Sequence, residues 1–120
     1  MFGRPSRDVA VIDYLEFPSA NGLKSREFFE SAFGWRFISY GPTYSGFEDA
    51  GIAGGIQGDP GDLTAAPLVV VRTDDLVKAE QKVVAAGGLI TRPAFDFPGG
   101  RRFHFREPGG NELAVWISRE

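Results

Sequence analysis

Apolar and polar residues alternate in short runs along the chain, and in two longer segments the apolar residues recur with helical spacing. The first run, residues 9–17 (VAVIDYLEF), is rich in β-branched and aromatic side chains, with acids at Asp13 and Glu16. Such a composition is typical of a strand, and Pro18 is expected to end it. The fold is therefore expected to begin with a strand at residues 9–17.

A helix is predicted directly after this strand, within NGLKSREFFESAFGW. Its apolar residues at helical spacing are Phe28, Phe29, Ala32 and Phe33. Asn21 is a suitable N-cap because its side chain can accept from a free backbone amide, and Gly34 suits the left-handed position that ends many helices. Three short strands, WRFISY, YSGFED and GIAGGIQ, are expected to follow, separated by turn residues.

The second half of the chain repeats this order. After a linker at residues 58–66, PLVVVRT predicts a strand, and DDLVKAEQKVVAAGG predicts a helix capped by Thr73 or Asp74. The strands LITRPAF, RRFHFRE and NELAVWI come next. The order βαβββ thus occurs twice within one domain, at about residues 9–57 and 67–118, as expected of an internal duplication.

Composition narrows the possible functions. The chain has 120 residues, 42% of them hydrophobic, which fits one soluble domain with a real core. It has no cysteine, so disulfides and thiolate metal ligands are excluded. No apolar run approaches the roughly 20 residues of a membrane helix, and a net charge of -3 with interspersed signs provides no basic stripe for nucleic acid. We expect a cytoplasmic protein without a membrane or nucleic-acid partner.

Four stretches, in this order and spacing, resemble the vicinal oxygen chelate superfamily, the glyoxalase, bleomycin-resistance and extradiol-dioxygenase group: YLEFPSANGLKSREFFESAFGW, GIAGGI, VRTDDLVKAEQKVVAAGG and FREPGGNELAVW. The resemblance covers residues 9–117. It implies an α+β fold in which two tandem βαβββ modules form a curled mixed sheet around a cleft, with the helices outside. In metal-using members, equivalent strand positions of the two modules bind a divalent ion through His, Glu or related residues.

The resemblance implies where the family's metal-ligand positions fall in this sequence. Three of them fall on Tyr14, Leu68 and Ala114. The fourth falls on the strand at residues 52–57, which has no carboxylate or imidazole. A divalent ion needs several oxygen or nitrogen donors within about 2.0–2.6 Å. The matched positions supply no conventional donor set. The expectation is therefore the fold and cleft of the family without its metal, and no cofactor.

Strand alternation predicts which side chains line the cleft. If Tyr14 points inward, so does Glu16; Arg72 then follows Leu68, and Glu112 and Trp116 follow Ala114. In RRFHFRE, the two phenylalanines are expected to meet the helices, which leaves His104 toward the cleft. The predicted ligand-binding residues are Tyr14, Glu16, Arg72, His104, Glu112 and Trp116.

Each of these residues also has a structural interpretation. Packing or a subunit interface explains Tyr14 and Trp116 more readily than ligand contact does, since aromatic residues serve all three purposes. Arg72 suits a structural ion pair with Glu16 or Glu112 as well as substrate binding. His104 suits a general base at neutral pH, although the sequence identifies no partner that would orient it.

Three classes of function stay open. The favoured hypothesis is a metal-independent protein that binds a small aromatic or amphipathic molecule, as the bleomycin-resistance branch implies. The second is a glyoxalase-like lyase, isomerase or dioxygenase-related enzyme, with His104 and Glu112 as acid and base. The third is a dimeric interaction module without a ligand. The resemblance also implies a homodimer, which agrees with a content of 13% aromatic residues, more than one small core readily encloses.

Overall fold

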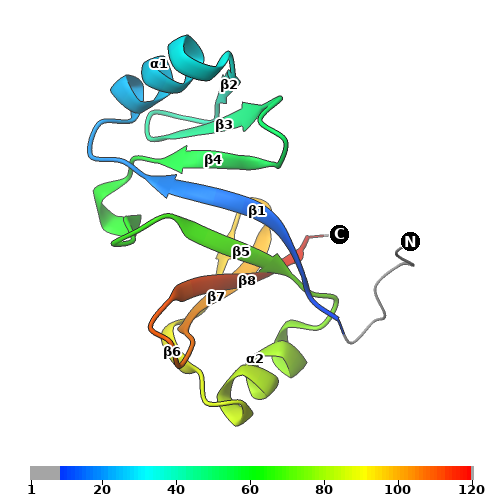
Figure 1. Ribbon diagram of the computed structural model, residues 1–120. Helices are drawn as coiled ribbons and strands as arrows, with labels where there is room; N and C mark the ends of the chain where they lie inside the picture. The colour runs from blue at the N-terminus through cyan, green and yellow to red at the C-terminus, as the bar shows by residue number, and fades with distance from the viewer. Residues whose placement is uncertain (1–8, 120) are drawn as a thin grey trace. The chain divides into compact units, whose positions relative to one another are not determined.

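A computed structural model describes residues 9–119 of the chain (Figure 1). Contacts divide the chain into two compact units. The N-terminal unit is Tyr14–Leu68, and the C-terminal unit combines the described residues up to Asp13 with those from Val69 onward. Each unit contains one helix and a set of hydrogen-bonded strands in the order βαβββ, so the α+β class and the repeated order of elements are as predicted.

The N-terminal unit has the strand order β2-β3-β4-β1. The only parallel neighbours in this set are β1 and β4, while β3 pairs antiparallel with both β2 and β4. A single turn of 3-10 helix, Pro60–Asp62, lies in the linker that follows. The elements are β1 (Val11–Pro18), α1 (Gly22–Phe33), β2 (Arg36–Ser39), β3 (Tyr44–Glu48) and β4 (Gly54–Gln57).

Both ends of α1 are as the sequence predicts. The Asn21 side chain accepts a hydrogen bond from the Lys24 amide at 3.1 Å, and Gly34 adopts a left-handed φ of 74°. Beyond the cap, Trp35 stacks on Phe29 with ring centroids 4.8 Å apart and lies 5.1 Å from Phe47. This aromatic cluster joins α1 to the strands and accounts for much of the high aromatic content.

The C-terminal unit has the strand order β5-β8-β7-β6. Here β5 and β8 are parallel, and β8, β7 and β6 are antiparallel in succession. The parallel and antiparallel pairs therefore repeat those of the N-terminal unit. The elements are β5 (Leu68–Arg72), α2 (Leu76–Ala85), β6 (Leu89–Phe97), β7 (Gly100–Arg106) and β8 (Glu112–Ser118).

The helix α2 begins one residue later than the sequence pattern indicates. Its N-cap is Asp75, whose carboxylate accepts from the Lys78 amide at 3.0 Å, so the prediction of a cap at Thr73 or Asp74 was wrong. Thr73 instead accepts from the Asp75 amide at 3.2 Å and forms a turn just before the helix. The Thr73 hydroxyl therefore stabilises the turn before the helix, and the Asp75 carboxylate caps the helix itself.

The core of the C-terminal unit lies between α2 and one face of its strands. Leu76, Phe103 and Val115 are its buried centre, and Phe105 packs against them. Because side chains alternate along a strand, the other residues of β7, among them His104, lie on the face that α2 does not cover. The predicted division of β7 into an apolar helix-facing side and a polar side is therefore confirmed.

Candidate functional site

The polar face of β5–β8 in the C-terminal unit brings together four of the six predicted ligand-binding residues. In the strand register, Arg72 is opposite Trp116, and His104 is opposite Ala114. Glu112 lies two residues before Ala114 on β8 and therefore on the same face. We refer to this surface as the polar face, defined by Arg72, His104, Glu112, Ala114 and Trp116.

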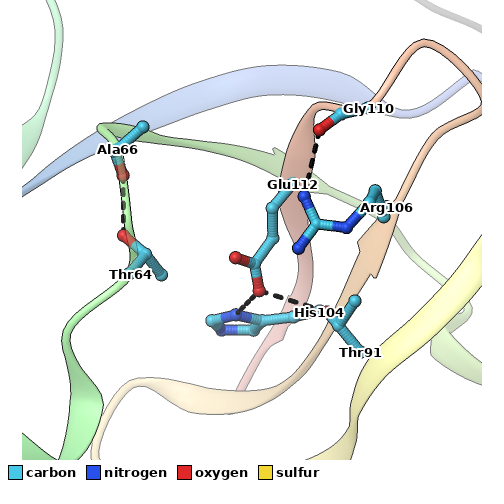
Figure 2. A network of polar contacts seen from close by, with 7 residues as sticks. All are labelled: Thr64, Ala66, Thr91, His104, Arg106, Gly110 and Glu112. Atoms are coloured by element: carbon cyan, nitrogen blue, oxygen red, sulfur yellow. Dashed lines mark hydrogen bonds and ion pairs between the residues drawn. The ribbon is translucent and has the colours of Figure 1, made fainter.

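At its centre is a buried histidine network (Figure 2). His104 is 2% exposed, and its Nδ1 lies 3.3 Å from Oε2 of Glu112. The same carboxylate oxygen accepts from the hydroxyl of Thr91 at 3.1 Å. The second ring nitrogen, Nε2, is also buried and has no hydrogen-bond partner among residues 9–119. The network thus orients one side of the imidazole and leaves the other side unsatisfied.

Burial lowers the pKa of His104 below its ordinary value, because the interior disfavours the charged imidazolium. The positive charge of Arg102 lowers it further, and that of Arg92 acts in the same direction. The hydrogen bond to Glu112 and its negative charge oppose this shift without reversing it. At neutral pH the ring is therefore in its uncharged form.

Arginine side chains and aromatic rings are interleaved around this network. The Arg72 guanidinium lies 5.1 Å from the ring centroid of Trp116, whose Nε1 donates to Asp13 at 2.9 Å. Arg102 lies 5.4 Å from the rings of both Phe95 and Phe97. Such contacts hold guanidinium groups beside aromatic faces. Within residues 9–119 no ion pair joins Arg72 to Glu112, whose partners are His104 and Thr91.

The two remaining predicted residues, Tyr14 and Glu16, form a separate network within the N-terminal unit. The hydroxyl of Tyr44 donates to Glu16 at 2.9 Å and lies 2.6 Å from the hydroxyl of Tyr14. Glu16 is buried. Burial, and then the negative charge of Glu16, raise the pKa of Tyr44 well above its usual range.

A glycine of the GIAGGI segment makes room for this network. A Cβ added to Gly55 would lie 2.5 Å from the hydroxyl oxygen of Tyr44, closer than atoms pack. Gly55 is opposite Glu16 in the parallel register of β1 and β4. The glycine therefore permits the close approach of the Tyr44 phenol side chain.

The sequence interpretation missed three partners of the predicted residues: Tyr44, Thr91 and Asp13. They are separated by 28, 21 and 103 positions from Glu16, Glu112 and Trp116, the residues to which they bond. No motif links such distant positions. Only the strand register, together with the side-chain geometry, reveals them.

The residues at the family's metal-ligand positions do not fit a divalent ion. Leu68 and Ala114 are buried apolar side chains, and the Tyr14 hydroxyl contacts Tyr44. In the part of the chain that the structure describes, no three or more His, Asp or Glu side chains cluster as metal ligands would.

Two βαβββ units with a polar sheet face define a protein of the glyoxalase-like α+β class. The sequence matches the Glyoxalase/Bleomycin resistance protein/Dioxygenase superfamily over residues 11–115, and the chain belongs to this family. The resemblance inferred from the sequence is thereby confirmed. No curated protein matches the sequence significantly.

Solved structures share the fold at low sequence identity. A glyoxalase/bleomycin resistance protein/dioxygenase superfamily member from Vibrio splendidus 12B01 is 13% identical, with a TM-score of 0.66, over 92% of this chain and 100% of that one. Methylmalonyl-CoA epimerase from Mycobacterium tuberculosis is 12% identical, with a TM-score of 0.69, over 92% and 89%. An extradiol ring-cleaving dioxygenase from B. fuscum is 16% identical, with a TM-score of 0.67, over 100% and 36%. These similarities concern the fold alone.

The helices of the described residues are too short and too polar to cross a bilayer. The longer of the two, α1, has 12 residues.

Proposed function

We propose that this protein binds a small aromatic or amphipathic molecule without a metal, and that the polar face of the C-terminal unit contacts the ligand. The observation that supports this most directly is the contact of the buried His104 with the partly exposed Glu112, on the same face as Trp116 and Arg72. A few fixed polar groups among apolar and aromatic side chains are the usual composition of a ligand site.

The expected energies are sufficient for measurable binding. A ligand ring stacked on Trp116 contributes about 0.5–1.5 kcal/mol beyond the burial of its area. A charge-assisted hydrogen bond from Arg72 adds roughly 1.5–3 kcal/mol. With burial of the remaining ligand surface, affinity in the micromolar range is expected.

Tryptophan fluorescence tests the proposal. Trp35 belongs to the aromatic cluster of the N-terminal unit, so a Trp35→Phe background keeps an aromatic ring there and leaves Trp116 as the only tryptophan. Binders from a library of aromatic compounds are expected to quench Trp116 and to raise the melting temperature. Arg72→Ala is expected to weaken their binding about tenfold or more.

Arg101→Ala is the matched control for Arg72→Ala. Arg101 is also an exposed arginine, but it is paired with Asp96 at 3.0 Å and alternates with Arg102 along β7. Its removal is expected to leave affinity unchanged. If no compound shifts the fluorescence or the melting temperature, or if both variants bind equally well, the polar face is not the binding site.

Tyr14 and Glu16 are proposed as ligand contacts of the N-terminal unit and are tested separately. Tyr14→Phe removes only the hydroxyl that lies beside Tyr44. Loss of affinity for a ligand in this variant would support a ligand contact at Tyr14. Equal affinity would restrict the ligand-binding role to the polar face.

Metal independence is tested by elemental analysis of protein purified without added metal or chelator. We expect no stoichiometric nickel, zinc, iron or manganese, because apolar side chains occupy the matched positions Leu68 and Ala114. About one ion per chain, lost in Glu16→Ala or Glu112→Ala, would contradict this part of the proposal.

A second candidate function is proton transfer by a glyoxalase-like enzyme. The observation that favours it is the 3.3 Å contact of His104 with Glu112, which resembles a general base held by an orienting carboxylate. The two functions differ in a measurable way. A carbonyl compound incubated in deuterium oxide would exchange its acidic hydrogens faster with the protein than without it only if the protein catalyses proton transfer, and His104→Gln would return the rate to that of the compound alone.

A further inference from the structure

The unsatisfied nitrogen of His104 identifies the hydrogen-bonding character of the ligand. Nε2 belongs to a side chain that is 2% exposed, and it has no hydrogen-bond partner among residues 9–119. Buried polar atoms in native proteins are nearly always paired, because an unpaired one loses its contact with water without compensation. Such an atom on the polar face therefore points to a group that the protein binds.

The location of the proton on the ring follows from the other nitrogen. Oε2 of Glu112 accepts from Thr91 and lies 3.3 Å from Nδ1 of His104 (Figure 2). The same oxygen acts as an acceptor toward Thr91, and it accepts from the imidazole in the same way if Nδ1 carries the proton of this contact, which is the tautomer we assign. A neutral imidazole carries one ring proton, and Nε2 is consequently a bare acceptor. The group that lies beside Nε2 therefore meets a lone pair, which accepts a hydrogen bond, and not an N–H donor.

Three kinds of partner are disfavoured at this lone pair. A carboxylate or carbonyl oxygen would be repelled by it unless the ring were protonated, which burial and Arg102 oppose. An ammonium group would be repelled by the positive charges of Arg102 and Arg92, both of which act on this ring. A divalent ion would need further donors, whereas the residue opposite His104 on β8 is Ala114.

We propose that the ligand of the polar face is a neutral hydrogen-bond donor, a phenolic hydroxyl or an aromatic N–H group, which donates to Nε2 of His104. This inference rests on the proposed function and specifies the ligand class for the same site. The ring of Phe95, with its centroid 5.8 Å from that of His104, lies beside the imidazole and adds an aromatic side chain to the site. The small side chain of Ala114 limits steric hindrance next to the imidazole.

The experiment uses the fact that the chain has one histidine. Untagged protein labelled with 15N-histidine gives only two imidazole nitrogen resonances, and long-range 1H–15N correlation shows which nitrogen is protonated. In the free protein at neutral pH we expect a protonated Nδ1 and an unprotonated Nε2. A protonated Nε2 with a bare Nδ1 would overturn the inference.

Matched ligand pairs then test the donor. Phenol and anisole, or indole and N-methylindole, share a ring but differ in the hydrogen that can be donated. We expect the donor of each pair to move the Nε2 resonance and to bind about tenfold more tightly, as one hydrogen bond implies. If both members quench Trp116 equally while Nε2 does not move, the inference is wrong and the proposed function stands. If aromatic compounds of neither kind bind, both are wrong.

A variant provides an independent measurement. His104→Phe keeps a ring of similar shape in the buried position but removes the acceptor. In the folded variant, the donor and its methylated analogue are expected to bind with equal affinity. A persistent tenfold preference for the donor would overturn the inference. Should the variant fail to fold, the resonances of the unaltered protein still decide the matter.

Discussion

His104 is a buried titratable group that makes the stability of the fold depend on pH. Its pKa is lowered in the folded state from an ordinary value near 6.5, mainly by burial. Below that ordinary value the unfolded chain binds a proton that the folded chain resists, so stability falls as pH decreases from about 6.5 toward the folded pKa. Above pH 7 both states are neutral at this residue, and its contribution does not change.

We therefore expect the melting temperature to decrease between pH 7.5 and pH 5 by more in the unaltered protein than in His104→Phe. The comparison cancels the titration of the exposed carboxylates, which is common to both proteins. The groups that affect His104 directly are Glu112, Arg102 and Arg92. Parallel pH profiles of the two proteins would show that the buried ring does not resist protonation.

The position of the N-cap of α2 can be tested by mutation. Asp75→Ala removes the acceptor of the Lys78 amide and is expected to lower the free energy of unfolding by about 1 kcal/mol. Asp74→Ala is the matched control, because Asp74 is an exposed neighbour that does not cap the helix. Urea denaturation of the two variants measures both changes. A larger loss in Asp74→Ala would place the cap where the sequence pattern had placed it.

Sequence patterns identified the elements well where the determining chemistry is local. Asn21 and Gly34 delimit α1 because a side-chain acceptor and a left-handed glycine act within one turn of the helix. The cap of α2 was misplaced by one residue because Thr73, Asp74 and Asp75 all suit an N-cap. Strand alternation correctly placed His104 and Phe103 on opposite faces, since it too depends only on neighbouring residues.

The polar networks depend on register between distant strands and could not be predicted in the same way. His104 had no identified orienting partner in the sequence, although Glu112 is only eight residues away. Their contact requires the antiparallel β7–β8 hairpin to place Arg106 opposite Glu112 and His104 opposite Ala114. Tyr44 reaches Glu16 only because β3, β4 and β1 are adjacent. A one-residue change of register would have separated each pair.

The two halves of the molecule repeat the same order of elements but have different side chains at equivalent positions of their strands. The last strand of each half has a small residue at the equivalent register position, Gly55 opposite Glu16 on β1 and Ala114 opposite Val70 on β5. On the next strand, the residue opposite Gly55 is Gly46, and the residue opposite Ala114 is His104. In the N-terminal half a tyrosine–carboxylate network therefore lies beside Gly55. In the C-terminal half the imidazole of His104 lies beside Ala114.

The outer surface of α1 bears on the predicted homodimer. No residue of this helix is buried, and Phe28 and Phe33, whose rings meet edge to face at 6.2 Å, are 59% and 62% exposed. Contiguous exposed apolar patches mark interaction sites, and aromatic residues are enriched at protein interfaces. We propose that two copies of the chain associate through α1. A stable interface needs about 800 Å² from each partner, so neighbouring residues must contribute as well.

Light scattering at micromolar concentration is expected to give twice the 13.1 kDa mass of the chain. Replacing Phe28 and Phe33 together by serine removes the apolar contact and is expected to yield the monomer mass with helical content retained. The matched control replaces Val77 and Val84, the exposed apolar residues of α2, at 69% and 55% exposure. Because these lie on the other helix, the control variant is expected to remain a dimer. A mass of 13.1 kDa for the unaltered protein would contradict the dimer itself, and a dimer that survives the α1 substitutions but not those in α2 would move the interface to the C-terminal unit.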